Sequence, residues 1–101
     1  MVLIRNRQTK IKIDEPKIKS AINKILKIVD YEGFDLGVWF TTDATIRKYN
    51  RTYRKKDKPT DILSFPYHTS LRPGERIAVE YPEDKNLGDI LISLEFASQD
   101  A

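Results

Sequence analysis

The chain has 101 residues with a formal net charge of +3 at pH 7, and it contains no cysteine and one histidine, His68. A chain of this length fits a single domain, residues 1–101, and the lack of cysteine excludes disulfide bonds, thiolate metal sites and cysteine nucleophiles within it. No apolar run approaches the roughly 20 residues that cross a bilayer, and the N-terminus does not look like a signal peptide, so we expect no membrane contact and a cytoplasmic location.

The spacing of apolar residues predicts the elements of the first half of the chain. Branched residues at 2–4 and the Lys-Ile-Lys-Ile alternation at 10–13 predict an opening strand with a polar turn between them. Asp14 is a helix N-cap residue, and apolar residues then recur at helical spacing up to Gly33. A strand is expected at 36–41, where apolar residues alternate.

The second half of the chain begins with a helix that Asp43 can cap. The spacing i, i+3, i+4, i+7 places four of its residues on one face and makes the two tyrosines core residues first; the four are Ile46, Tyr49, Asn50 and Tyr53. Pro59 ends this region, and a short buried strand is expected at 61–65.

A long connection over residues 67–86 follows the short strand, and a brief edge strand at 77–79 is expected within it. The apolar run at 87–92 predicts a further strand, and Ser93 can cap a last helix that begins at Leu94.

Positive charges gather where the second helix is expected to end. Asp57 is the only acid between Arg51 and Lys58. Such a cluster can attract a polyanion. A solvated helix end and loop would give the same pattern, so charge alone leaves both readings open.

Three segments together form a specific pattern: YN and YR within residues 49–54, DKPTDILSFP at 57–66, and LGDILIS at 87–93. They resemble the YbeY family of bacterial rRNA-maturation endoribonucleases. The resemblance implies an α+β fold, a small mixed sheet with helices packed on it. It also implies a single-strand-specific, metal-dependent endoribonuclease that acts in 16S rRNA maturation and ribosome quality control. Its partners would be a single-stranded rRNA precursor and the small ribosomal subunit.

The family binds one zinc through three histidines of the pattern His-Gly-x-x-His-Leu-x-Gly-x-Asp-His. This sequence ends at Ala101, before that segment should begin, so no residue inherits the role of a zinc ligand. We therefore expect the chain to represent the first two-thirds of the family, without the C-terminal zinc-binding helices. Alone, it should bind no stoichiometric zinc and be inactive.

The resemblance assigns the catalytic role to Arg54, which matches the family's functionally important arginine. Its planar guanidinium suits bidentate phosphate contact, although a solvated helix-terminal arginine is the alternative. Four aromatic residues interleave with the basic cluster, as stacking platforms for single-stranded bases would: Tyr49, Tyr53, Phe65 and Tyr67. Tyr67, just outside a strand, is the better candidate for stacking on a base. Further cations that can contact RNA phosphates, each of which could equally be a surface charge, are Arg51, Lys55, Lys56 and Lys58.

Other sites and functions remain as alternatives. His68 lies outside the family's histidine triad, and we expect it to play no part in metal binding. Asp61 and Asp89 could hold magnesium as a carboxylate pair. In place of an enzyme, the chain could be a non-catalytic RNA- or ribosome-binding module, or a protein-interaction fragment whose core is covered by a partner.

Overall fold

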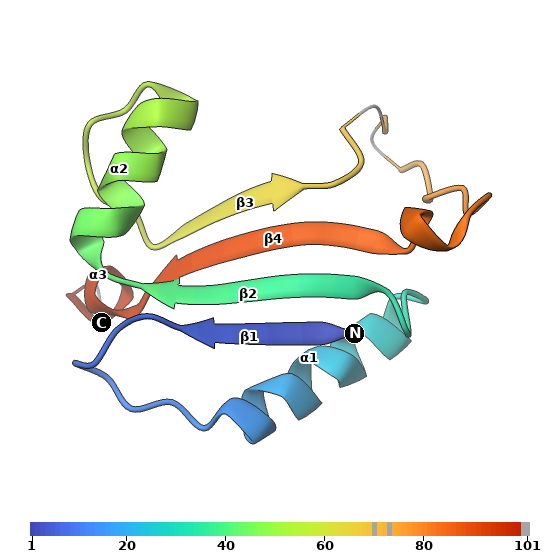
Figure 1. The fold of residues 1–101 in the computed structure, drawn as a ribbon, viewed down its shortest axis with the longest axis horizontal. Helices are drawn as coiled ribbons and strands as arrows, with labels where there is room; N and C mark the ends of the chain where they lie inside the picture. Colours follow the sequence, from blue (N-terminus) through green and yellow to red (C-terminus); the bar gives the residue numbers. More distant parts are fainter. Residues whose placement is uncertain (70, 73, 100–101) are drawn as a thin grey trace.

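The computed structural model describes residues 1–69, 71–72 and 74–99. A four-stranded mixed sheet has the strand order β1-β2-β4-β3. β1 pairs parallel with β2 and β2 with β4, whereas β3 runs antiparallel to β4 at the edge (Figure 1). The α+β architecture predicted from the sequence is confirmed. The elements in chain order are β1 (Val2–Asn6), α1 (Glu15–Ile28), β2 (Asp35–Thr41), α2 (Asp43–Arg54), β3 (Ile62–Pro66), the 3₁₀ turn η1 (Pro82–Asp84), β4 (Asn86–Ser93) and α3 (Leu94–Gln99).

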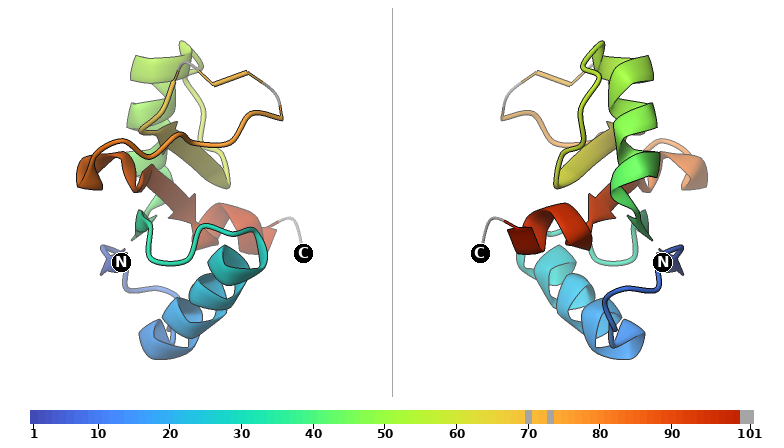
Figure 2. Two further views of the ribbon diagram at one scale, coloured as in Figure 1. Left: turned by 90° about the vertical axis from the view of Figure 1, so that its right-hand side faces the viewer. Right: turned by 90° about the vertical axis from the view of Figure 1, so that its left-hand side faces the viewer.

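The helices α1 and α2 lie on opposite faces of the sheet (Figure 2). Because side chains alternate along a strand, Val38 and Trp39 of β2 point to different faces. α1 packs against β1, where Val2 is buried, and contributes Leu26 to the core. Within the described ranges, no helix is long and apolar enough to span a membrane.

α1 begins as its sequence predicts, because the Asp14 carboxylate accepts the amide of Lys17 at 3.1 Å. Its apolar stripe is only partly covered. Leu26 is buried, whereas Ile25 and Val29 are 56% and 41% exposed. Helical periodicity thus identified the helix but overstated how much of the stripe the sheet covers.

α2 is fixed to the sheet by Ile46, which is completely buried against Leu63 and Leu91. Its N-cap is Thr42, whose hydroxyl accepts the amide of Thr45 at 3.3 Å. The prediction that Asp43 caps this helix is therefore wrong by one residue.

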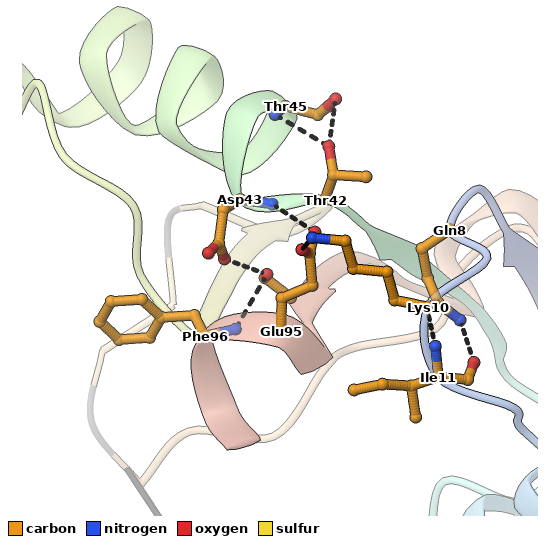
Figure 3. A network of polar contacts seen from close by, with 9 residues as sticks. Gln8, Lys10, Ile11, Thr42, Asp43, Thr45, Glu95 and Phe96 are labelled. Carbon is orange, nitrogen blue, oxygen red and sulfur yellow. Dashed lines mark hydrogen bonds and ion pairs between the residues drawn. The ribbon is translucent and has the colours of Figure 1, made fainter. Parts of the chain in front are cut away.

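Asp43, in the first turn of α2, joins a polar junction at the ends of three segments (Figure 3). Its carboxylate accepts the Ser93 hydroxyl at 2.6 Å, and its amide donates to Glu95 at 3.2 Å. Lys10 contacts the second carboxylate oxygen of Glu95 at 2.8 Å. The junction therefore links the loop after β1, the start of α2 and the start of α3.

Protonation of the Glu95 carboxyl at low pH weakens this junction. The hydrogen bond from Lys10, followed by the amide of Asp43, holds the pKa of the Glu95 carboxyl below its usual range. A carboxyl with a lowered pKa in the folded state stabilises that state at neutral pH. This contribution falls as the pH drops through the lowered pKa.

Two strands predicted from the sequence are absent from the described part of the chain. Residues 10–13 form a loop because the Gln8 side chain bonds both backbone groups of Ile11, at 2.6 and 2.9 Å. Residues 77–79 are also irregular, and the Ile77 amide donates to the Tyr31 hydroxyl at 3.3 Å instead of to a strand. In both places a side chain makes the backbone hydrogen bond that a neighbouring strand would make in a sheet.

Gly88 allows β3 to approach β4 closely. It has a φ of +100°, and a Cβ there would collide with the carbonyl oxygen of Phe65 and lie 2.7 Å from the amide of Tyr67. We expect Gly88→Ala to lower the free energy of unfolding by at least about 2 kcal/mol, since backbone strain adds to a steric clash.

Urea denaturation would measure the loss, with Gly33→Ala as the matched control. Gly33 also has a positive φ, +82°, but nothing lies within 4 Å of its would-be Cβ. Gly33→Ala should therefore lower the free energy of unfolding only by the cost of backbone strain, about 1 kcal/mol. Equal losses in the two variants would contradict the close approach at Gly88.

Candidate functional site

Five of the six predicted site residues lie together at the end of α2 and in the loop that follows. All five side chains are exposed, and they are named here the basic turn: Arg51, Arg54, Lys55, Lys56 and Lys58. Arg51 and Arg54 are one helical turn apart on the same side of α2. The structure therefore gathers these cations into one surface.

The chain reverses direction sharply at the basic turn. α2 ends at Arg54, and Lys55 has the left-handed conformation with a φ of 60°. The amides of Lys55 and Lys56 both donate to the carbonyl oxygen of Asn50. These bonds satisfy a carbonyl at the helix end and define the path of the following loop.

Asn50 also holds the far side of the basic turn. Its side-chain amide donates to the carbonyl oxygen of Lys58 at 2.8 Å, and the residue is only 1% exposed. Helical spacing places Asn50 on the same face of the helix as Ile46 but assigns it no role. The sequence feature that could have revealed this role is a polar residue at a position expected to be buried, because such a residue needs a hydrogen-bond partner.

The only acid within the basic turn is neutralised from outside it. The Arg47 guanidinium contacts both carboxylate oxygens of Asp57, at 2.9 and 3.2 Å. This hydrogen bonding, with the nearby charge of Arg51, holds the pKa of the Asp57 carboxyl below its usual range. Since Arg47 takes the negative charge, the positive field of the five cations is left for an external anion.

Tyr67, the sixth predicted residue, lies away from the basic turn. It follows the last residue of β3, whereas the basic turn precedes the first, and the five-residue strand between them spans about 16 Å at the usual rise. Its ring is 50% exposed and meets His68 edge-on, with centroids 5.1 Å apart. The proposed stacking of Tyr67 on a base stays a prediction.

A second feature, the aromatic hollow, opens between α2 and the sheet. Its volume is about 580 Å³, within the range of ligand-sized pockets. Tyr49 and Tyr53 are 39% and 63% exposed, so the prediction that they are core residues is wrong. The lining residues are Arg7, Trp39, Thr41, Thr42, Thr45, Tyr49, Tyr53, Phe65, Asp89 and Leu91.

The aromatic hollow and the arginines of the basic turn lie on opposite flanks of α2. Successive residues of an α-helix are rotated by about 100°. With Ile46 and Asn50 facing inward, the two tyrosines project on one side of this buried stripe and the two arginines on the other. The chain thus offers a charged surface and an aromatic surface that are separate.

The described residues do not fit a zinc ion. They contain no group of three or more histidine, cysteine, aspartate or glutamate side chains that could hold a metal. His68 lies within hydrogen-bonding distance of the Asp84 carbonyl oxygen through its Nε2 atom, at 2.7 Å. Asp61 and Asp89 lie at opposite ends of the β3–β4 ladder, so the structure does not bring the alternative magnesium pair together.

The family model described as Endoribonuclease YbeY matches residues 3–101. The chain is 39% identical over 95 residues to the Endoribonuclease YbeY of Homo sapiens, covering 94% of this chain and 57% of the relative. Identity to the protein of the same name from Aquifex aeolicus (strain VF5) is 39% over 100 residues, covering 99% and 59%. Identity to the Endoribonuclease YbeY of Syntrophus aciditrophicus (strain SB) is 38% over 100 residues, covering 99% of this chain and 58% of the relative. The chain therefore spans less than three-fifths of the length of these relatives.

We expect Asn50→Ala to loosen the basic turn and to lower the free energy of unfolding by about 0.5–1.5 kcal/mol, because the hydrogen bond to the carbonyl oxygen of Lys58 is lost. Hydrogen exchange should show faster exchange at the amides of Lys56 and Lys58. Thr52→Ala, an exposed substitution on the same helix, is the control and should leave these amides protected. Unchanged exchange in Asn50→Ala would contradict the tether.

Proposed function

Because this chain belongs to the YbeY family of endoribonucleases, we propose that it forms part of a single-strand-specific endoribonuclease and that the basic turn binds the phosphates of the RNA. One observation carries the proposal for this surface. Five exposed cations lie on a hydrogen-bonded turn whose only acid is already paired with Arg47. RNA backbones are bound by such arrays through charge rather than base identity.

Within this proposal, Arg54 acts on the phosphate that is cleaved. Hydrolysis of a phosphodiester builds negative charge on the phosphate oxygens in the transition state, and a preorganised cation stabilises that charge. The guanidinium can donate two parallel hydrogen bonds to two oxygens, which a lysine cannot do. Arg51, Lys55, Lys56 and Lys58 then hold the neighbouring phosphates and set the position of the strand.

The zinc implied by the resemblance carries no step in this account. The described residues offer no ligand set for it, so we propose that they contribute charge and positioning rather than metal binding. The family resemblance supports the finer parts of the proposal. These are zinc, one per complete protein, action on precursors of 16S rRNA, quality control on the small ribosomal subunit, and a cytoplasmic location.

A non-catalytic RNA- or ribosome-binding module is the second candidate function. The described part of the chain holds cations and exposed rings suited to RNA, but no group of metal ligands, and this combination favours it. The two candidates differ in one measurable respect, because only the first predicts cleavage of RNA.

Binding of a single-stranded RNA of mixed sequence tests the basic turn. We expect affinity to fall steeply with salt and to depend little on RNA sequence, since counterion release drives phosphate binding. Arg54→Ala should weaken binding, as measured by fluorescence anisotropy. Lys17→Ala, which removes an exposed cation on α1, should have a smaller effect. Equal losses in the two variants would contradict a localised site.

Joining a family-type C-terminal segment after Ala101 tests the catalytic role. We expect the parent chain to hold no stoichiometric zinc after dialysis, and the joined protein to gain both zinc and ribonuclease activity. Arg54→Ala in the joined protein should keep its zinc and lose about 10²–10³ in cleavage rate, the usual effect of removing one preorganised donor. Elemental analysis and a gel assay separate the two readouts. If Arg54→Ala in the joined protein cleaved RNA as fast as the joined protein without the substitution, the role of Arg54 would be refuted. A zinc-loaded joined protein that never cuts RNA would support the binding module.

A further inference from the structure

We propose that the aromatic hollow binds one nucleotide of the single-stranded RNA and prefers a base with an exocyclic amino group. This inference rests on the proposed function, because it takes RNA as the ligand, and it adds a second contact with a different chemistry. The hollow lies on the flank of α2 that faces away from the arginines of the basic turn. It therefore needs its own explanation.

Four aromatic rings give the hollow surfaces on which a base can stack. Tyr49 and Tyr53 are nearly parallel, with centroids 6.0 Å apart and an angle of 9° between their planes. Phe65 meets the ring of Tyr53 edge-on at 5.1 Å, and Trp39 adds its indole. Tyr53 is 63% exposed, so a large apolar ring faces water where a base would cover it. Stacking on such rings tolerates any base and stabilises single-stranded nucleic acids.

The floor of the hollow adds a hydrogen-bond acceptor. The Asp89 carboxylate lies directly over Gly37, where a Cβ would collide with its Oδ1 atom. The Trp39 Nε1 atom lies 3.4 Å from the same point. Glycine at position 37 thus leaves room for the carboxylate beside the indole.

Among the described residues, neither the Asp89 carboxylate nor the Trp39 indole N–H has a hydrogen bond to another side chain. An incoming base would therefore displace no such bond. A carboxylate accepts hydrogen bonds only, so it favours the exocyclic amino groups of adenine, cytosine and guanine. Uracil has carbonyl oxygens on both sides of its N3–H, and these oxygens repel a carboxylate. Asp89 is therefore the group expected to discriminate between bases.

Charge around the hollow favours RNA over a peptide. The Arg7 guanidinium lies 5.9 Å from the Trp39 ring centroid, and Arg5 pairs with Trp39 in the strand register and shares its face of the sheet. A lysine-rich peptide would be attracted by Asp89 but repelled by the two arginines. An acidic peptide would be attracted by the two arginines but repelled by Asp89. A nucleotide satisfies both, since its phosphate matches the arginines and its amino group matches the carboxylate.

Trp39 makes the hollow directly observable, because it is the only tryptophan of the chain. Its fluorescence can be titrated with the tetranucleotides A₄, C₄ and U₄ and with an abasic phosphodiester tetramer. We expect saturable quenching by A₄ and C₄ at concentrations about tenfold lower than for U₄, in line with the usual discrimination by one base contact. The abasic tetramer should not quench.

Two variants with a matched control assign the contacts. Asp89→Asn should remove the difference between C₄ and U₄, because its amide can also donate to a carbonyl. Tyr53→Ala should weaken quenching by all tetranucleotides about tenfold through the loss of one stacking surface. Tyr81→Ala is the control, since Tyr81 is equally exposed at 62% but lies outside the hollow. It should leave every titration unchanged.

Several results would overturn the inference. They are equal quenching by the three tetranucleotides, a base preference that survives in Asp89→Asn, quenching by the abasic tetramer, or tighter quenching by a lysine-rich peptide than by RNA. Arg54→Ala separates this inference from the proposed function. If the variant binds long RNA normally and the Trp39 titrations behave as expected, the basic turn fails and the hollow stands. If long RNA depends on Arg54 and no tetranucleotide quenches Trp39, the hollow alone fails.

Discussion

The burial of Ile46 against Leu63 and Leu91 is the contact on which both candidate surfaces depend. It fixes one stripe of α2 to the sheet and thereby sets the direction of every other side chain on that helix. One turn later, Asn50 extends the stripe and bonds the loop beyond the helix. Because the stripe is narrow, residues on its two sides stay exposed, and the aromatic and basic surfaces arise there.

The hydrogen bonds of Asn50 and the ion pair of Asp57 make the basic turn an ordered surface rather than a flexible run of charges. A flexible run would lose conformational entropy on binding, and that loss would offset part of the gain from phosphate contacts. Here the backbone around Lys55 is already fixed by bonds to the end of α2. The side chains would still have to order around the proposed phosphates, but the path of the chain is already set.

The sequence predicts the sheet and both long helices well because their signals are repeated over many residues. Single-residue features fared less well. The helix at residues 43–54 was recognised by spacing, yet spacing cannot decide whether Asn50 or Tyr53 faces the sheet, since both lie within the same broad stripe. The structure buries Asn50 because the Lys58 carbonyl oxygen supplies a partner. That partner lies in a loop whose path the local sequence does not specify.

The misassigned strand at residues 10–13 has a local cause, because the Gln8 side chain takes both backbone groups of Ile11. Long-range tertiary contacts decided the site. The motif at 57–66 pointed to the basic turn, but Tyr67 at its end is separated from that turn by the length of β3. Nothing in the local pattern indicates that Arg7, Trp39 and Asp89 meet, because they come from the loop after β1, from β2 and from β4.

The two flanks of α2 suit the two parts of RNA recognition. Phosphate contacts position a strand without reading it, whereas base contacts confer preference. A surface that combined both would couple affinity to sequence, so that every weakly preferred base would also weaken cleavage. In the two proposals, separate surfaces let Arg54 act on any phosphate while Asp89 biases where along the strand the chain binds. This division requires a strand that extends around α2 from one flank to the other, which single-stranded RNA can follow and a stiff duplex cannot. Taken together, the two proposals predict a preference for single strands that arises from the geometry of the helix.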